Sequence, residues 1–469
     1  MNDRAVALAL AGLVLVARIP FASHTLWAWD SVLYARALEQ GFHVGTDLAD
    51  QRPHPPGYIF YVAAAAALRA ITRDSNAALV IISILASALT AAVVYLLCRR
   101  YADRALAVIV ALGAASAPLV WTYGEVAMPY ALLGLLSVVL AMSMREARSR
   151  AWPAALLASA GLGIAAGLRQ DVLLLLGPLW LWMILGRPWR ERALCLAALG
   201  IACLAWFVPS AFLSGGPAAY LASLSGQAAR VSELSPAAGG DALLRNALLT
   251  IYALWWGLLG FAVLLIAAIV AALTARRRLT DETMFIALWL IPAALVYVTI
   301  HIGDPGYLMS MLPGLYVALA ALLAPVARRS AALVIPWTAL FVVINAAVFA
   351  LGDNPFSASA IARHDRVLNQ RVAWVRALAP SSTVVLARSE YLIARYYLPA
   401  YRVLFDGPAP EVLSSSAREV SVSAPTSVFF FGSIPSPFPT SVNLQIGGDA
   451  PSGTIVSGAT LIAYDLEPR

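Results

Sequence analysis

The sequence contains no lysine and little charge of any kind. All 32 basic residues are arginines, and charged residues make up 12% of the 469 positions, whereas 61% are hydrophobic. A soluble domain is about half apolar and a quarter charged. The shortage of charge therefore excludes an ordinary soluble protein and indicates a polytopic membrane protein.

Cysteine is also scarce. The three cysteines, Cys98, Cys195 and Cys203, lie in or beside apolar segments, which excludes a disulfide framework and a cysteine-based zinc site. The arginines stand in short loops between apolar runs, so they indicate membrane orientation, and we expect no nucleic-acid partner. The apolar run 5–16 has no convincing cleavage site after it, and we interpret it as a retained anchor.

Long apolar runs dominate the first three quarters of the chain. A helix needs about 20 apolar residues to cross a bilayer. We predict about eleven spans, at 5–21, 77–97, 105–121, 129–144, 153–168, 172–186, 193–213, 247–274, 284–302, 306–324 and 331–351.

Arginines collect on alternate loops, which the positive-inside rule makes cytoplasmic. They are Arg4, Arg99, Arg100, Arg104, Arg145, Arg148, Arg150, Arg187, Arg190, Arg192, Arg276, Arg277, Arg278, Arg328 and Arg329. We then place on the outer side of the membrane the segments 22–76, 122–128, 169–171, 214–246, 303–305 and everything after about residue 352. If segment 57–71 also crossed the membrane, every later loop would change sides and the arginine bias would invert. It is short and contains Arg69, so we predict an interfacial or half-inserted helix.

The composition changes after residue 352, where apolar runs shorten. We predict helices at 360–378 and 390–397 and strands at 383–387, 401–405, 427–431 and 458–465. The predicted fold is thus an α-helical membrane domain over 1–352 followed by a small extracytoplasmic α/β domain over 353–469.

The first outer loop, 22–76, is the longest polar interval before that domain. Asp30 and Tyr34 stand one helical turn apart, beside Trp27 and Trp29, which favour the headgroup level. Asp30 is a candidate catalytic carboxylate, although it could equally cap a helix or be solvated. His54 precedes a diproline that makes a rigid corner. A lone histidine of this kind is either a ligand or a structural hydrogen bonder.

Other outer loops add fewer polar groups. Glu125 is the only charge of the second loop, and a carboxylate at a membrane edge needs water or a partner. Arg169 and Asp171 form either a local pair or part of a phosphate site, since arginine engages phosphate through paired donors. Arg52 is an alternative candidate for binding the phosphate. The turn that holds His301, Asp304 and Tyr307 belongs to the same surface.

The order and placement of these motifs resemble the GT-C superfamily of integral-membrane glycosyltransferases, which includes protein O-mannosyltransferases and aminoarabinose transferases. Three short motifs and the outer C-terminal domain carry the resemblance. The motifs are Trp29-Asp30 with Tyr34, His54-Pro55-Pro56-Gly57-Tyr58, and Glu125 just before Pro129-Tyr130.

The resemblance implies an inverting glycosyltransferase with a polyprenyl-phosphate-linked sugar donor and a glycan, lipid or protein hydroxyl as acceptor. It would act at the outer face of a bacterial cytoplasmic membrane. The catalytic residues implied are Asp30 as general base and Glu125 as a second acidic residue. Relatives differ at the position of His54, which leaves open whether a divalent metal is held by Asp30, His54 and Glu125. The candidate substrate-binding residues are Tyr34, Arg52, His54, Arg169, Asp171 and Tyr307.

Two other functions compete with this hypothesis. A transporter or lipid flippase usually has internal repeats and charges near the midplane, whereas here we find no repeat and the acidic residues lie in outer loops. A non-catalytic membrane assembly protein would use the C-terminal domain for binding. The enzyme hypothesis requires Asp30 and Glu125 to converge on one cavity at the outer leaflet.

Overall fold

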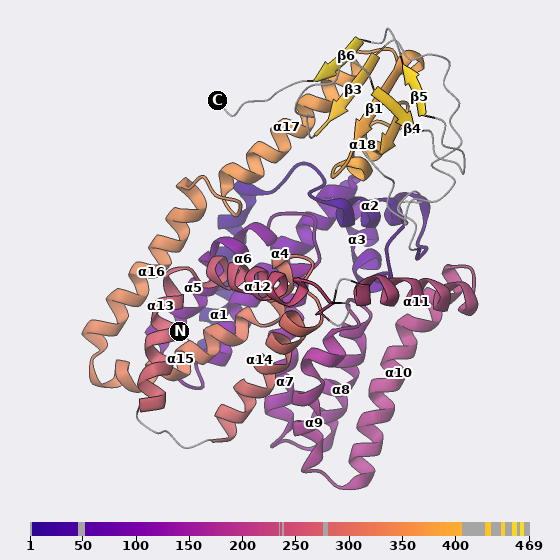
Figure 1. Ribbon diagram of the computed structural model, residues 1–469. Helices are drawn as coiled ribbons and strands as arrows, with labels where there is room; N and C mark the ends of the chain where they lie inside the picture. The colour runs from indigo at the N-terminus through magenta and orange to yellow at the C-terminus, as the bar shows by residue number, and fades with distance from the viewer. Residues whose placement is uncertain are drawn as a thin grey trace.

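The computed structural model describes residues 2–45, 52–233, 235–236, 239–274, 280–405, 427–432, 442–445, 453–456 and 460–463. It consists of a large helical bundle with a small α/β domain at one end (Figure 1). The bundle contains α1 (Asp3–Arg18), η1 (Ile19–Phe21), α2 (Trp29–Gln40), α3 (Ile59–Thr72), α4 (Ser75–Cys98), α5 (Arg104–Ser116), α6 (Pro118–Tyr123), α7 (Tyr130–Ala147), α8 (Trp152–Ala166), α9 (Val172–Leu185), α10 (Trp189–Leu213), α11 (Pro217–Glu233), α12 (Ala242–Leu258), α13 (Gly260–Thr274), α14 (Asp281–Thr299), η4 (Pro305–Ser310), α15 (Leu312–Arg329) and α16 (Ala331–Leu351).

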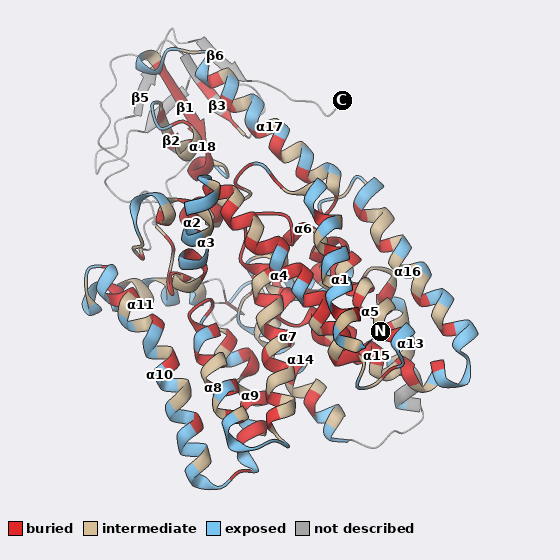
Figure 2. Cartoon of the chain, turned by 180° about the vertical axis from the view of Figure 1, so that it is seen from behind, coloured by how far each residue is buried: buried red, intermediate tan, exposed pale blue. Residues whose placement is uncertain are grey.

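The apolar runs form helices as predicted. Within the described residues, seven helices are long and apolar enough to cross a membrane, or eight if α12 and α13 together form one span, and α5, α8 and α9 are shorter apolar helices. The continuous span predicted at 247–274 is wrong, because the chain bends by 103° between α12 and α13, where Leu259 takes a positive φ of 44°. The predicted span 105–121 also breaks, at Ala117, because Pro118 begins a new helix. Many large apolar side chains face outward along these helices (Figure 2).

Several arginine-bearing loops, among them those after α7 and α9, lie at the end of the bundle that is far from the C-terminal domain (Figure 1). Arg100 pairs with Glu146, and Arg187 donates to the carbonyl of Arg150 at 2.9 Å. At the same end, the Tyr95 hydroxyl donates to Asp3 at 2.7 Å. This clustering agrees with the predicted common side for these loops. Arg276, Arg277 and Arg278 lie outside the described residues.

Helix α3 fits the prediction of a segment that does not span. It has 14 residues and is therefore about 21 Å long, shorter than the roughly 30 Å hydrocarbon core. At its start the Tyr58 ring lies 5.1 Å from the ring of Tyr34 in α2. Just beyond its end, the Ser75 hydroxyl donates to Glu39 of the same short helix at 3.1 Å. Both ends of α3 therefore lie on one side of the bundle.

The C-terminal domain is the predicted α/β unit. It contains α17 (Ala358–Arg376), η5 (Pro380–Ser382), β1 (Thr383–Ala387), α18 (Tyr391–Tyr397), β2 (Arg402–Phe405), β3 (Ser427–Phe431), β4 (Val442–Gln445), β5 (Gly453–Val456) and β6 (Thr460–Ala463). One sheet has the order β2-β1-β3-β6 with every pairing parallel, and β4 pairs with β5 in an antiparallel ladder. All five residues of β1 are buried, as a central parallel strand requires. The pair β4–β5 was not predicted.

A buried carboxylate attaches this domain to the first outer loop. Asp365 of α17 is 8% exposed and accepts four hydrogen bonds, from the hydroxyls of Ser23 and Thr25 at 2.9 and 2.5 Å and from the backbone N–H groups of His24 and Thr25 at 2.8 and 3.1 Å. Close by, the N–H of Leu26 donates to the Tyr397 hydroxyl at 2.9 Å. The loop and the domain therefore form one continuous structure.

We expect Asp365→Ala to destabilise the protein by on the order of 3 kcal/mol, because it leaves several buried donors without an acceptor. Thermal unfolding in detergent and protease accessibility of the C-terminal domain measure the effect. Asp353→Ala is the matched control, since Asp353 is 75% exposed and its bonds to Arg363 and Ser359 lie at the surface. Equal unfolding temperatures for the two variants would contradict the proposed attachment.

Candidate active site

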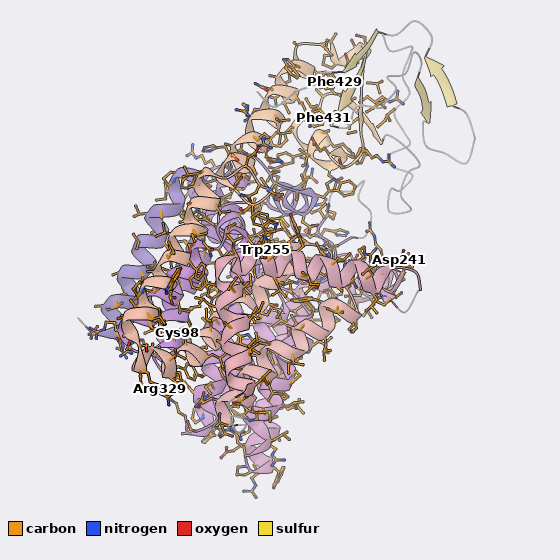
Figure 3. The ribbon with its side chains drawn as sticks, turned by 60° about the vertical axis from the view of Figure 1, so that its left-hand side comes forward. Cys98, Asp241, Trp255, Arg329, Phe429 and Phe431 are labelled. Atoms are coloured by element: carbon orange, nitrogen blue, oxygen red, sulfur yellow. The ribbon has the colours of Figure 1, made fainter. Side chains whose placement is uncertain are left out.

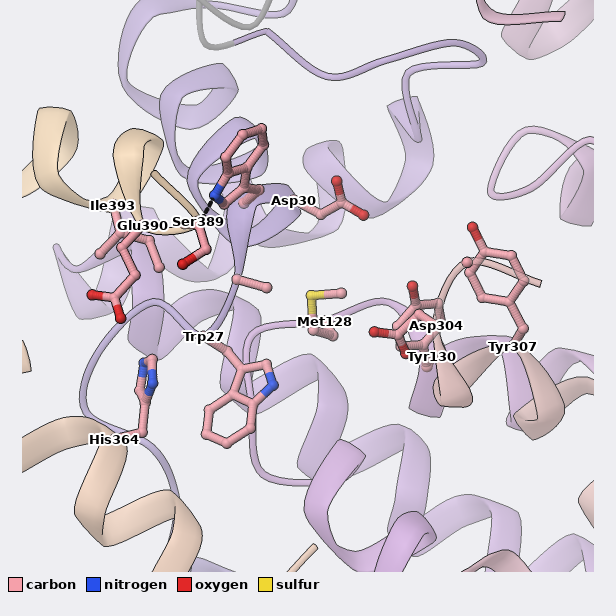
Figure 4. Close-up of a pocket in the computed structure, with 13 residues that line it drawn as sticks. Trp27, Asp30, Met128, Tyr130, Asp304, Tyr307, His364, Ser389, Glu390 and Ile393 are labelled. Atoms are coloured by element: carbon pink, nitrogen blue, oxygen red, sulfur yellow. Dashed lines mark hydrogen bonds between the residues drawn. The ribbon is translucent and has the colours of Figure 1, made fainter. Parts of the chain in front are cut away.

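A pocket lies where the first outer loop, the segment before α7, the η4 turn and the C-terminal domain meet. Its volume is about 760 Å³, within the usual range of about 300–1,000 Å³ for ligand sites. Figure 4 shows Asp30, Tyr130, Asp304 and Tyr307 on one side of it and His364, Ser389, Glu390 and Ile393 on the other, with Trp27 and Met128 between. The pocket is therefore shared by the membrane domain and the C-terminal domain.

Asp30 stands in the first turn of α2, where a helix N-terminus favours negative charge. Its side chain is 31% exposed, and its Oδ1 lies 3.8 Å from His54 Nε2. The other ring nitrogen of His54, Nδ1, lies 2.9 Å from the carbonyl oxygen of Pro55. Because a carbonyl only accepts, Nδ1 carries a hydrogen and orients the ring toward Asp30.

The two side chains shift each other's pKa. Burial raises the pKa of Asp30, but the hydrogen bond and charge of His54, together with the charges of Arg169 and Arg230, outweigh it and hold that pKa below its usual value. Burial lowers the pKa of His54, and Asp30 more than compensates, so the pKa of His54 is raised. Asp30 is thus an ionised carboxylate at neutral pH, and it favours the charged form of His54.

The corner predicted at the diproline positions His54. The N–H of Gly57 donates to the carbonyl of His54 at 2.9 Å and closes the turn. Gly57 has a φ of +92°, and a Cβ there would come within 2.3 Å of Val44. Only glycine fits this turn without strain.

A second carboxylate of the pocket is Asp304, at the N-terminus of η4. It accepts hydrogen bonds from the N–H of Gly306 at 2.7 Å and from the Tyr123 hydroxyl. Burial raises the pKa of Asp304, the negative charge of Asp30 adds to this, and the two hydrogen bonds only partly oppose it. The pKa values of the two carboxyls therefore move in opposite directions, an arrangement typical of acid–base sites. Sequence reasoning placed Asp304 on this surface without choosing it as a catalytic candidate.

Arg169 and Asp171 form a local ion pair, which is one of the two alternatives that the sequence left open. Arg169 Nε and Nη2 donate to the two oxygens of Asp171 at 3.1 and 2.7 Å. The guanidinium lies 3.9 Å from the centroid of the Tyr307 ring, a cation–π contact. Arg169 is 8% exposed. Since these bonds use Nε and Nη2, Nη1 remains available to an anion beside Tyr307.

Tyr34 and Arg52 do not line the pocket. The Tyr34 ring is buried against those of Tyr58 and Tyr61, each at 5.1 Å, and its hydroxyl has no hydrogen-bond partner within the described structure. Arg52 donates to the carbonyl of Gly41 at 2.9 Å in an exposed part of the loop. The substrate-binding roles predicted for these two residues stay predictions.

The structure does not bring Glu125 to the pocket. Glu125 is fully buried, accepts a hydrogen bond from Trp121 Nε1 at 2.6 Å and lies 3.8 Å from Arg18 Nη1. Arg18 stands at the end of α1 and also donates to the carbonyls of Trp121 and Ala115. A buried cation in a membrane domain needs a polar or acidic partner, and the Glu125 side chain lies against Arg18. The expected convergence of Asp30 and Glu125 on one cavity is therefore not observed, and the form of the enzyme hypothesis that needs both carboxylates is wrong. Asp304 and Glu390 are the other acidic residues that line the pocket.

Of the three candidate metal ligands, Asp30 and His54 lie together and Glu125 lies elsewhere. In the part of the chain that the structure describes, no three His, Cys, Asp or Glu side chains gather into a metal site. Asp30 and His54 could supply two ligands, but the donor set is incomplete.

The buried carboxyl group of Glu125 makes the stability of the folded protein depend on pH. Burial raises its pKa to about 8, with Arg18 and Trp121 opposing, whereas the unfolded chain releases this proton near the ordinary glutamate pKa of about 4.3. Folding therefore takes up a proton between these values, and stability falls as pH rises through the window. Glu125→Gln imitates the protonated acid, so the melting temperature of the wild type should fall relative to this variant from pH 5 to 8. Melting curves that stay parallel across this range would contradict the assignment.

Comparisons with known proteins agree with this architecture. Residues 53–212 match the family described as dolichyl-phosphate-mannose-protein mannosyltransferase. No curated protein sequence matches the chain. The fold is similar to crystal structures of ArnT from Cupriavidus metallidurans, one bound to undecaprenyl phosphate and one in the apo state, each with a TM-score of 0.57, 14% identity and coverage of 87% of this chain and 86% of ArnT.

A weaker likeness joins the chain to the oligosaccharyltransferase AglB from Archaeoglobus fulgidus in complex with an inhibitory peptide and a dolichol-phosphate. The TM-score is 0.45 at 14% identity, covering 85% of this chain and 64% of that one. The family match over residues 53–212 and the fold shared with ArnT thus agree with the resemblance predicted from the motifs.

Proposed function

We propose that the protein transfers a sugar from a polyprenyl-phosphate-linked donor to an acceptor hydroxyl, with inversion, at the outer face of a bacterial cytoplasmic membrane. The observation that carries the proposal is an ionised Asp30, paired with His54, in a pocket at the end of the bundle opposite the arginine-bearing loops. ArnT, whose fold is similar, has been crystallised with undecaprenyl phosphate, which supports this class of donor.

Asp30 acts as the general base. The acceptor oxygen attacks the anomeric carbon from the face opposite the phosphate, the bond from that carbon to the phosphate oxygen breaks, and the acceptor proton passes to Asp30. The lipid phosphate leaves with the bonding electrons. A carboxylate whose pKa is lowered is ionised at neutral pH and ready to accept the proton. His54 orients Asp30 and keeps it ionised.

Arg169 stabilises the leaving phosphate. Its Nη1 group is available beside Tyr307, and Asp171 and the Tyr307 ring hold its plane in place. A fixed guanidinium aimed at developing negative charge lowers the barrier without reorganising during the reaction. Tyr307 itself lines the pocket and lies between Arg169 and the space that the sugar would occupy.

The proposed sugar transfer uses only side chains of this protein. Asp30 and His54 would be ligands of a divalent cation if one were bound, and among the described residues no third His, Cys, Asp or Glu side chain completes a metal site with them. We assign Glu125 no role in the reaction because its carboxyl group faces Arg18.

Asp30→Asn should lower the rate of sugar transfer by about 10²- to 10⁴-fold, since the amide cannot accept the proton. Mass spectrometry of products formed from a panel of polyprenyl-phosphate monosaccharides measures the transfer. Asp353→Asn removes a carboxylate outside the pocket and should transfer like the wild type. A folded Asp30→Asn protein with wild-type rates would rule out the proposed mechanism.

His54→Gln should move the acidic limb of the pH profile of kcat/KM to higher pH. The base must be deprotonated, so activity is lost as pH falls through its pKa. In the wild type His54 holds that pKa below the usual aspartate value of about 3.9, and removing its charge lets burial raise it. Rates measured from pH 3.5 to 8 test this, and an acidic limb that stays in place would show that His54 does not act on the base.

A further inference from the structure

The proposed chemistry uses only one side of the pocket. The other side is formed by Trp27 of the first outer loop and by His364 and Glu390 of the C-terminal domain (Figure 4). These three side chains belong to segments that are more than 330 residues apart in the chain, yet they line the same space as Asp30. None of them has a role in proton transfer or in binding the leaving phosphate.

Trp27 and His364 form one polar and aromatic wall. Their ring centroids are 4.7 Å apart with an interplanar angle of 48°. His364 Nε2 lies 3.1 Å from the carbonyl oxygen of Leu26. Because the carbonyl can only accept, Nε2 carries the hydrogen, and Nδ1 of the neutral ring is an acceptor. The wall therefore offers an aromatic face next to a nitrogen that can accept a hydroxyl hydrogen.

Glu390 is a fixed carboxylate beside this wall. Arg371 Nη1 lies 3.0 Å from each of its oxygens and Arg371 Nη2 lies 3.5 Å from the carbonyl of Gly432. The Glu390 side chain is still 32% exposed, so its remaining lone pairs can accept further hydrogen bonds. In Figure 4 the Glu390 carboxylate and the His364 ring point toward one another across this side of the pocket.

The charge of the pocket restricts its second ligand. Three lining residues are acidic, namely Asp30, Asp304 and Glu390, and among the described residues that line it there is no arginine. On the Glu390 side, away from Arg169 and Tyr307, an anionic group would be repelled, whereas a neutral molecule with many hydroxyl donors matches the acceptors. A sugar has an apolar C–H face that packs on an indole and hydroxyls around its rim that donate to carboxylates.

We propose that Trp27, His364 and Glu390 form the acceptor subsite and that the acceptor is a neutral carbohydrate. This inference rests on the proposed function, because it assigns the acceptor that the Asp30 chemistry needs. The acceptor sugar stacks on Trp27 and donates hydroxyl hydrogens to Glu390 and His364. One further hydroxyl then lies toward Asp30, on the opposite side of the pocket. The C-terminal domain thereby selects the acceptor, while the membrane domain binds the donor.

Binding of methyl glycosides to the full-length protein in nanodiscs tests the subsite without requiring transfer. Ligand-observed NMR with the methyl glycosides of glucose, galactose and mannose should show binding to the wild type. Trp27→Ala and Glu390→Gln should each weaken it about 10- to 100-fold, since each removes a stacking face or a charged acceptor. Trp27→Phe should retain part of the binding. Trp337→Ala is the matched control, because Trp337 is 53% exposed on α16, and it should bind like the wild type.

The outcomes separate this inference from the proposed function. No binding of any methyl glycoside to the wild type, or binding that Trp27→Ala and Glu390→Gln leave unchanged, would overturn the carbohydrate subsite. Binding of a threonine-containing peptide in place of the glycosides would overturn it in favour of a protein acceptor. Asp30→Asn should bind glycosides normally while losing transfer. If Asp30→Asn transfers normally, the proposed mechanism fails even where glycosides bind at Trp27.

Discussion

The pocket depends on the carboxylate of Asp365. Four donors from residues 23–25 converge on this one side chain, and hydrogen bonds to a buried charged acceptor are stronger than neutral ones. The contact fixes the C-terminal domain on the segment that leads into α2. It therefore sets the distance between Asp30, at the start of α2, and Glu390 and His364, which face it from the other domain (Figure 4). Figure 3 shows the C-terminal domain, marked by Phe429 and Phe431, at the end of the molecule opposite to Arg329.

A second set of bonds holds the segment before α7 under the pocket. The Ser83 hydroxyl of α4 donates to the carbonyls of Val126 and Met128 at 2.8 and 3.0 Å, and the Ser31 hydroxyl of α2 donates to that of Ala127 at 2.8 Å. The Arg18–Glu125 pair lies immediately before these residues. Such bonds satisfy backbone groups that the helices leave without partners. Glu125 thus helps to shape the floor of the site although its carboxylate does not reach it.

The sequence predicted those features that local pattern determines. Apolar runs identify the helices and the change of composition after residue 352 identifies the α/β domain, because burial and periodicity are local properties. Gly257 and Gly260 flank the bend at Leu259, but an isolated glycine is tolerated inside an apolar helical pattern, so these two did not predict a break. Likewise Asp365 resembles any polar residue of an amphipathic helix until the 23–25 segment is placed against it.

The misplacement of Glu125 has a different physical cause. Its partner Arg18 follows the apolar run of α1 directly, at the end of a predicted span, and sequence position alone gave no reason to pair it with a loop more than 100 residues later. The predicted neighbourhood of Asp30 and His54, by contrast, follows from a single loop with a rigid corner. Residues that lie close within one loop could be predicted, whereas pairs that join distant helices could not.

The bonds between Asp365 and residues 23–25 join positions about 340 apart in the chain. During synthesis the first outer loop is made long before the domain that completes its pocket. The pocket around Asp30 is therefore complete only after almost the entire protein has been synthesised and its last quarter has folded. A half-made chain thus lacks the wall that His364 and Glu390 supply, and the pocket exists only in the finished protein.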